Sequence, residues 1–254
     1  MSWIKSPPDD FVGCKSFMDN TIFLWESENK KVYVMDNHLS SAWCWINRCN
    51  PKDMYDFMHI DRHSDLALKC FYDFLETEQF LNFKKNPKID FSSFTDISKV
   101  KDGVCRKLFQ WDNYIRVIHY LYPHWFNRNI FYFYEGESNC PKTNYCDEFV
   151  FVRETPDAVI KGVDKYLRSQ DSRFPNRKWI LNLDLDFFWK DNGARRFDDT
   201  FIYDLSKRIN AAMSNIEVFT IAISPDCIGW KWDEARHVLD IMKTEVKELE
   251  EFII

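Results

Sequence analysis

The chain has 254 residues, of which 45% are hydrophobic and 17% aromatic, so it can bury a sizeable core and does not resemble a disordered chain. The formal net charge of -6 argues against a general nucleic-acid-binding protein and mildly favours a cationic substrate. No apolar run approaches the roughly 18 residues of a membrane span, and the first residues lack the apolar segment of a signal peptide. We therefore expect a cytoplasmic protein that acts away from membranes.

The eight cysteines are scattered, and no pair has C-x-x-C spacing, which argues against a zinc ribbon or a thioredoxin motif. In a cytoplasmic chain we expect reduced and mostly buried thiols. Cys227 differs from the others only in lying close to a candidate site loop.

Apolar runs typical of strands alternate along the chain with patterns typical of helices. Strands are predicted at Thr21–Trp25, Lys31–Met35, Tyr55–Ile60, Ile130–Tyr134, Phe149–Val152, Trp179–Leu185 and Val218–Ile223. Helices are predicted at Ser40–Arg48, Leu66–Phe80, Gln110–Tyr120, Pro156–Arg168, Asp199–Ser214 and Asp233–Phe252, with Ser40 and Asp199 as N-caps. The first two strands flank a polar loop and are expected to form a hairpin. The alternation predicts an α/β fold, a three-layer sandwich with a mainly parallel central sheet.

Residues 1–254 are predicted to form a single catalytic domain, since the length suits one large α/β domain. The stretch Asn82–Lys107 is polar and irregular. We interpret it as a surface insertion or a lid, and not as a linker between domains.

Two clusters of acidic and histidine residues each follow an apolar run. Asp61, His63 and Asp65 follow the first run, and Asp184 and Asp186 end the second. These residues occupy every second position, which places their side chains on one face of a strand. Acidic groups gathered at a strand tip would repel one another unless a cation were bound there.

A third motif of this kind ends another apolar run with His38. The carboxyl ends of parallel strands lie along one edge of an α/β sheet, where ligands bind. His38 and the five clustered residues make six ligands, enough for two metals if Asp61 and Asp184 each bridge them. Mixed carboxylate and imidazole ligands suit Mn, Fe or Zn better than Ca. Two Mn ions that share a water or hydroxide suit this set, whereas a single metal would leave two acids without a role.

His59 has the same strand parity as Asp61 but lies one step deeper in the run. We interpret it as a core histidine whose hydrogen bonds are satisfied within the protein.

The ligand pattern resembles that of the ureohydrolases of the arginase/deacetylase fold, in which a histidine after an early strand is followed by D-x-H-x-D and then D-x-D. Four stretches resemble more narrowly the peptide arginases, which convert arginine residues within a peptide to ornithine and release urea. They are Asp36–His38, Ile60–Asp65, Leu183–Phe188 and Ser224–Gly229. The resemblance runs from about residue 30 to residue 230, but only these short motifs are specific. It implies an arginase/deacetylase-like fold, two Mn²⁺ ions held by His38, Asp61, His63, Asp65, Asp184 and Asp186, and an arginine-containing peptide as substrate.

The sequence departs from the ureohydrolase pattern in three places. The usual G-G-D-H segment is Met35-Asp36-Asn37-His38 here. The polar loop that holds the head group of free arginine is replaced by Leu66–Cys70, which reads as apolar and helical. The proton-shuttling histidine has no evident counterpart. The second departure favours arginine inside a peptide over free arginine.

Two acidic residues are candidates for the chemistry of guanidinium hydrolysis. Asp65, beside the shared water, would take up the proton of the nucleophile and pass it to the leaving amine. Asp226 would hold the guanidinium through two parallel hydrogen bonds; the alternative for Asp226 is a turn or N-cap role after Pro225. Glu135 and Glu137 are weaker candidates for the substrate rim.

Two other functions fit parts of the same pattern. A zinc-dependent deacetylase of the same fold would need one metal and usually a pair of histidines as general base, and no His-His pair occurs in the sequence. A non-catalytic binding protein could use the metal only to hold strand ends together, with its abundant tryptophans forming a protein-binding surface. Metal content and turnover distinguish the three functions.

Overall fold

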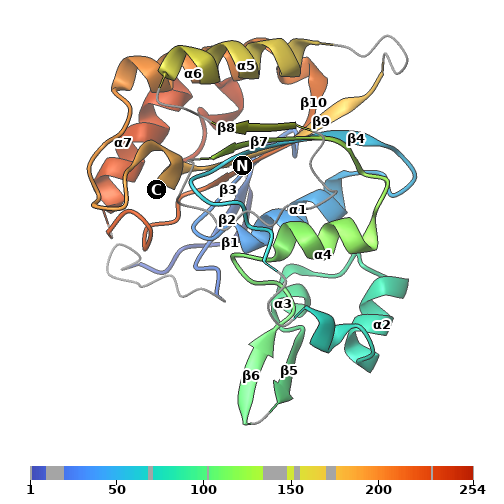
Figure 1. Ribbon diagram of the computed structural model, residues 1–254. Coiled ribbons are helices and arrows are strands. Elements are labelled where there is room, and N and C mark those ends of the chain that lie inside the picture. The colour runs from blue at the N-terminus through green and yellow to red at the C-terminus, as the bar shows by residue number, and fades with distance from the viewer. Residues whose placement is uncertain are drawn as a thin grey trace.

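Eight strands form one central sheet that helices cover on both faces (Figure 1). The computed structural model describes residues 2–9, 20–67, 71–101, 103–133, 148–151, 155–169, 176–229 and 231–253. The strands of the sheet are β1 (Ser2–Lys5), β2 (Leu24–Glu26), β3 (Val32–Met35), β4 (Tyr55–Ile60), β7 (Phe126–Phe133), β8 (Glu148–Phe151), β9 (Lys178–Asp184) and β10 (Ile216–Ala222). Their order is β1-β2-β3-β10-β9-β4-β7-β8. All pairings from β3 to β8 are parallel, whereas β1–β2 and β2–β3 are antiparallel.

Five of the seven helices of the described residues form two layers against the sheet (Figure 1). The seven helices of the described chain are α1 (Leu39–Arg48), α2 (Glu78–Lys85), α3 (Phe91–Thr95), α4 (Tyr114–Leu121), α5 (Pro156–Arg168), α6 (Asp199–Ala211) and α7 (Trp232–Lys243). Short 3₁₀ turns lie at Tyr72–Phe74, Leu185–Phe188, Met213–Asn215 and Lys247–Leu249. Helices α5, α6 and α7 cover one face of the sheet, and α1 and α4 cover the other (Figure 1).

Side chains of the central strands alternate between two apolar clusters, one on each face. In β9, Leu181 and Leu183 belong to the cluster with α5, α6 and α7, whereas Ile180 belongs to the cluster with α1 and α4. Successive side chains of a strand point to opposite faces, so each face has its own core. The prediction of an α/β fold with a mainly parallel sheet is confirmed, as is the hairpin of β2 and β3.

The predicted helix Leu66–Phe80 is wrong in its described part. Residues 66 and 67 are not helical, residues 72–74 form a single 3₁₀ turn, and α2 begins only at Glu78. Thr77 sets this start, because its hydroxyl accepts a hydrogen bond from the Phe80 amide. Phe71 and Phe74, which lie within the predicted helix, are instead buried in the cluster under α1 and α4.

The stretch Asn82–Lys107 contains regular structure that the sequence reading did not predict. It includes the end of α2, helix α3 and a hairpin of β5 (Ser98–Lys101) and β6 (Val104–Lys107). This segment extends away from the central sheet beside α4 (Figure 1). Strand β1 was also not predicted, because it is only four residues long and its residues are exposed or partly buried.

The predicted N-caps are displaced by one or two residues. Asp198, and not Asp199, caps α6 by accepting a hydrogen bond from the Phe201 amide. His38, and not Ser40, is the residue that precedes α1. The last predicted helix ends at Lys243, and a 3₁₀ turn follows it. Within the described residues, no helix combines the length and the hydropathy needed to span a membrane.

Candidate metal centre

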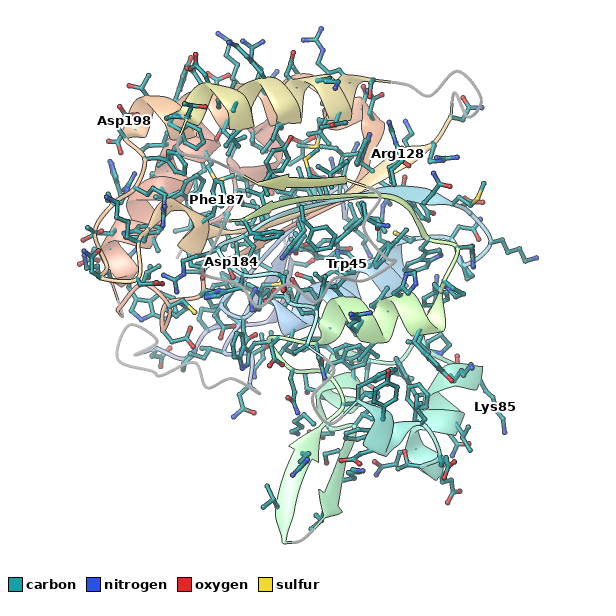
Figure 2. All side chains as sticks on the ribbon, in the orientation of Figure 1. Trp45, Lys85, Arg128, Asp184, Phe187 and Asp198 are labelled. Atoms are coloured by element: carbon teal, nitrogen blue, oxygen red, sulfur yellow. The ribbon has the colours of Figure 1, made fainter. Side chains whose placement is uncertain are left out.

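The six predicted ligands lie together at the carboxyl ends of three strands. His38 follows β3, the loop of Asp61, His63 and Asp65 follows β4, and Asp184 ends β9. Strands β3, β10, β9 and β4 are consecutive neighbours in the sheet, so their ends share one edge. Figure 2 shows Asp184 on the side of the sheet where Trp45 of α1 lies. Because the strands are parallel, segments distant in sequence deliver their polar side chains to one place.

One part of the centre is built around His38. Its Nδ1 lies 2.6 Å from Asp184 Oδ2, 3.3 Å from Asp65 Oδ2 and 3.6 Å from Asp61 Oδ2. His38, Asp61 and Asp65 form one group whose ligand atoms lie within 4.8 Å of one another. All four side chains are buried.

The other part of the centre is built around His63. Its Nδ1 lies 3.1 Å from Asp186 Oδ2 and 3.6 Å from Asp61 Oδ1. Asp61, His63 and Asp186 form a second group whose ligand atoms lie within 4.8 Å of one another. Asp61 belongs to both groups, which is the arrangement expected of a bridging carboxylate.

Asp184 was the second predicted bridge, and the structure places it at the His38 side of the centre. Its Oδ2 accepts a hydrogen bond from the Ser224 hydroxyl at 2.6 Å, and its Oδ1 accepts one from the Asp186 amide at 2.9 Å. Each carboxylate oxygen has two lone pairs, so both oxygens keep capacity for a further ligand. These bonds orient the carboxylate in the way that outer groups orient metal ligands.

The polar atoms of the centre that lack partners are the atoms a metal would use. Buried polar atoms are nearly always hydrogen-bonded, so each exception calls for an explanation. At this centre the buried atoms without a hydrogen-bond partner include His38 Nδ1, Asp61 Oδ2, both oxygens of Asp65, His63 Nδ1 and Asp186 Oδ2. The donor set therefore fits one or two metal ions that take mixed nitrogen and oxygen ligands.

The electrostatics of the centre also favour a bound cation. Burial raises the pKa of Asp65 well above its usual value, and burial with the neighbouring Asp186 raises that of Asp184 to about 7. Burial alone would lower the pKa of His63, but the adjacent carboxylates of Asp186 and Asp61 raise it to about 11. Protons thus balance part of the negative charge where a cation would otherwise do so.

Two residues at the centre have left-handed backbone conformations that are uncommon outside glycine. Asp65 has φ of 50° and Ser224 has φ of 44°. Such conformations persist when surrounding contacts enforce them and are concentrated at functional sites. The Ser224 amide donates to the Asp36 carbonyl at 3.0 Å, which ties the end of β10 to the end of β3.

Arg62 holds the ligand loop against the two neighbouring strand ends. Its amide donates to Asp186 Oδ1 at 3.2 Å, and its Nη1 donates to the Cys227 carbonyl at 3.4 Å. Its Nε lies 3.6 Å from Asp186 Oδ2 and 3.6 Å from Asp191 Oδ1. Arg62 is buried, so its charge offsets some of the acidic charge of the centre.

The centre is most open at His63. The side chain of His63 is 25% exposed, whereas that of His38 is 4% exposed and those of the acids are fully covered. The ring of the partly exposed Trp111 lies edge-on to the His63 ring at 6.3 Å between centroids. A ligand would therefore reach the centre from the side of His63 and Trp111.

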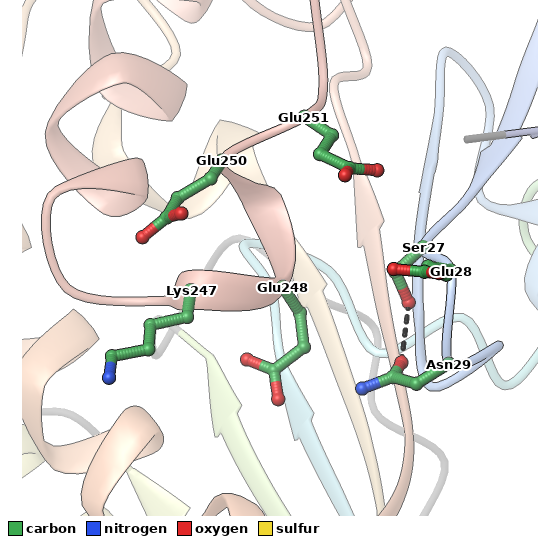
Figure 3. A pocket seen from close by; sticks show the side chains of 7 residues that line it. All are labelled: Ser27, Glu28, Asn29, Lys247, Glu248, Glu250 and Glu251. Carbon is green, nitrogen blue, oxygen red and sulfur yellow. Dashed lines mark hydrogen bonds between the residues drawn. The ribbon is translucent and has the colours of Figure 1, made fainter.

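Asp226 lies in the turn that follows Ser224, and its side chain is exposed. The Asp226 carboxylate would therefore be shielded from water only when a ligand covers it. Glu135 and Glu137 lie outside the residues that the structure describes. A surface pocket of about 350 Å³ between the β2–β3 turn and the 3₁₀ turn at Lys247–Leu249 is lined mainly by acidic residues (Figure 3). The β2–β3 turn leads into β3, so this pocket lies at the amino end of β3, whereas His38 follows the carboxyl end of that strand.

The sequence reading missed Ser224, Arg62, Trp111 and the surroundings of His59 as parts of the centre. Ser224 stood in a quoted motif, but nothing local indicated its bond to Asp184. His59 is buried and hydrogen-bonded, as expected of a satisfied core histidine. The sequence did indicate that His59 and Asn182 lie near the centre, since each precedes a predicted ligand by two residues. A scan against models of protein families gives no match for this sequence, and neither does a search of curated proteins.

Proposed function

We propose that this chain is a dinuclear manganese hydrolase that converts arginine residues of a peptide to ornithine and releases urea. One observation carries the proposal: buried ligand atoms of five predicted metal ligands lie together without hydrogen-bond partners. The two ligand groups that share Asp61 favour two ions over one. The resemblance to the peptide arginases supplies the reaction and the substrate class.

The chain's own residues divide the work in the proposed reaction. When bound, the two ions would lower the pKa of water and so supply a nucleophile near neutral pH. Asp65 would accept the proton of that nucleophile and return it to the leaving amine. Asp226 would hold the guanidinium plane through paired charge-assisted hydrogen bonds, and would become covered when the peptide binds.

The segment after Asp65 supports a peptide substrate. Leu66 is buried, its carbonyl accepts a hydrogen bond from Arg116 Nε at 3.1 Å, and the Ala67 amide donates to the Asp112 carbonyl at 2.8 Å. The backbone of this segment is thus engaged within the protein, and its side chains are apolar. Groups that would recognise the amino and carboxylate ends of free arginine are missing from these two residues.

The deciding experiment is mass spectrometry of arginine-containing peptides after incubation with the manganese-loaded protein. Each arginine is expected to lose the mass difference between arginine and ornithine, with an equal amount of urea released. Free arginine should be a poor substrate by kcat/KM, and comparable values for the two substrates would contradict the peptide assignment.

Controls separate this function from its rivals. An Asp61→Asn protein should show no turnover, whereas Asp157→Asn on the exposed surface of α5 should behave as the unaltered protein. One zinc per chain with peptide deacetylation and no urea would favour a deacetylase. Bound metal with no turnover of either kind would favour a metal that only holds strand ends together.

A further inference from the structure

A second row of buried polar side chains lies directly beneath the ligands. His59 and Asn182 are register partners on β4 and β9, and Asn182 and Thr220 are register partners on β9 and β10. All three are fully buried. The row lies two residues before the ligands Asp61 and Asp184, and therefore on the same face of the sheet. Polar groups in a sheet core cost free energy unless they are fully hydrogen-bonded. These three side chains therefore need hydrogen-bond partners, and their presence in the core calls for an explanation.

Asn182 is the centre of this row and makes four hydrogen bonds. Its Nδ2 donates to His59 Nδ1 at 2.9 Å and to the Tyr114 hydroxyl at 2.9 Å. Its Oδ1 accepts from the Thr220 hydroxyl at 2.7 Å and from the Ser41 hydroxyl at 3.0 Å. The amide thereby uses both of its donors and both of its lone pairs.

The partners of the Thr220 hydroxyl indicate which atoms donate and which accept in these bonds. Trp45 of α1 donates its indole N–H to Thr220 Oγ1 at 3.2 Å, and an indole nitrogen can only donate. The Thr220 hydroxyl has one hydrogen to donate, and its nearer acceptor is Asn182 Oδ1 at 2.7 Å, whereas the Leu181 carbonyl lies at 3.4 Å. The Asn182 amide must then present N–H to His59, so His59 Nδ1 is an acceptor.

The surroundings of the other ring nitrogen lead to the same assignment. His59 Nε2 lies 3.2 Å from the His63 carbonyl oxygen and 3.4 Å from Asp61 Oδ2. Both neighbours are acceptors, so His59 Nε2 must carry a hydrogen. The surroundings of both ring nitrogens therefore indicate the same neutral tautomer, with the hydrogen on Nε2.

We propose that His59 is a positioning residue, held by Asn182 in the Nε2–H tautomer, which fixes the Asp61–Asp65 loop in its metal-binding shape. This inference rests on the metal centre of the proposed function. His59 donates to the His63 carbonyl and directs its N–H at Asp61, while the His63 amide donates to Asp61 Oδ1 at 2.6 Å. The loop is thus held on both sides of His63, before the left-handed turn at Asp65. Groups of this kind around metal ligands typically contribute about 10- to 100-fold in affinity.

The first test needs no substitution. Long-range ¹⁵N–¹H correlation spectra of the histidine-labelled, metal-free protein report which ring nitrogen carries hydrogen, and a His59→Gln protein identifies the His59 signals. We expect a neutral His59 ring with hydrogen on Nε2. Hydrogen on Nδ1, or on both nitrogens, would overturn the proposal.

The second test measures manganese affinity by calorimetry in three variants. Asn182→Asp replaces the donor to His59 Nδ1 with an acceptor, and should move His59 off its tautomer and weaken binding about 10- to 100-fold. His59→Leu should weaken binding similarly. His59→Gln keeps an amide N–H at the place of Nε2, and should retain most of the affinity that His59→Leu loses.

A control on the other face of the same strand separates positioning from stability. Met58→Leu should change the unfolding free energy slightly and leave manganese affinity unaltered, because Met58 packs in the opposite cluster. Equal affinity in Asn182→Asp and the unaltered protein would overturn the proposal; if that variant does not fold, His59→Leu matching His59→Gln would do so. Absence of manganese binding in the unaltered protein would reject the metal centre, while the tautomer would still be decided by the spectra.

Discussion

The two faces of the central sheet are built from the same strands, and each buries an apolar cluster, but they differ in the polar groups that they bury. On the face under α5, α6 and α7, β9 contributes Leu181 and Leu183 to an apolar cluster. On the face under α1 and α4, the same strand contributes Asn182 and Asp184, both fully buried and both polar. Burying a leucine side chain stabilises by about 2 kcal/mol, whereas burying an uncompensated acid costs several. The apolar clusters of both faces therefore stabilise the fold, and the face under α1 and α4 also carries the free-energy cost of a buried polar site.

The largest effect is expected when a polar residue is placed on the face under α5, α6 and α7. Leu183→Asn would remove apolar burial and leave an amide among apolar side chains, at a combined cost of roughly 4 to 6 kcal/mol. That is a large part of the stability of a typical domain. We expect little folded protein, as measured by circular dichroism and urea unfolding. A cooperative transition at the unaltered midpoint would show that this face tolerates polar groups.

A substitution at the metal centre, on the face under α1 and α4, should instead leave the fold intact and remove metal binding. Asp61→Asn should abolish binding of both metals and all turnover, because Asp61 belongs to both ligand groups. His38→Ala should weaken only one metal, because His38 belongs to a single group. Elemental analysis after dialysis checks both outcomes, with a folded far-ultraviolet spectrum as the control. Full metal occupancy in Asp61→Asn would exclude it as the bridge.

The pH dependence of stability should distinguish Asp184 from an ordinary surface acid. In the metal-free protein the folded pKa of Asp184, about 7, lies above the ordinary value of 3.8. A raised folded pKa means that this carboxyl favours the folded state at low pH and that the contribution is lost as pH rises from about 4 to about 7. Relative to the unaltered protein, Asp184→Asn should therefore gain a few kcal/mol of stability over this interval, since one pKa unit corresponds to about 1.4 kcal/mol.

Urea unfolding in the presence of a chelator, at several pH values between these limits, measures that difference. Asp240→Asn, which removes one acid from the exposed surface of α7, is the matched control. A constant difference between Asp184→Asn and the unaltered protein would mean that Asp184 is not held in a protonated state.

The smallest expected effect concerns the rim of the site. Asp226→Asn should leave metal content and stability unaltered, because the side chain is exposed and lies beyond the ligands. Turnover of the arginine peptide should fall about 100-fold, given ~3 kcal/mol for a lost charged contact. Near-normal kinetics would assign the guanidinium contact to another acid, and Glu135 and Glu137 would be tested next.

Much of the fold was predictable because burial leaves a local signal. The runs at Tyr55–Ile60 and Trp179–Leu185 were recognised as strands because they are continuously apolar or alternate with period two. Helix α5 has the predicted bounds, since Pro156 starts it and an amphipathic pattern follows. The helix predicted at Leu66–Phe80 failed because aromatic residues that pack from a turn resemble those that pack from a helix.

The sequence by itself determined which residues could bind a metal, since carboxylates and imidazoles at alternate positions after buried runs have few structural uses. It also determined that the runs belong to an α/β sheet. Only the tertiary structure decided which strands are neighbours, and therefore that Asp61 joins two ligand groups and that Ser224 orients Asp184. The pairing of His59 with Asn182 joins residues 123 positions apart, and was likewise decided by the register of β4 and β9. Register between parallel strands depends on how whole faces pack against their helices, and no local pattern records it.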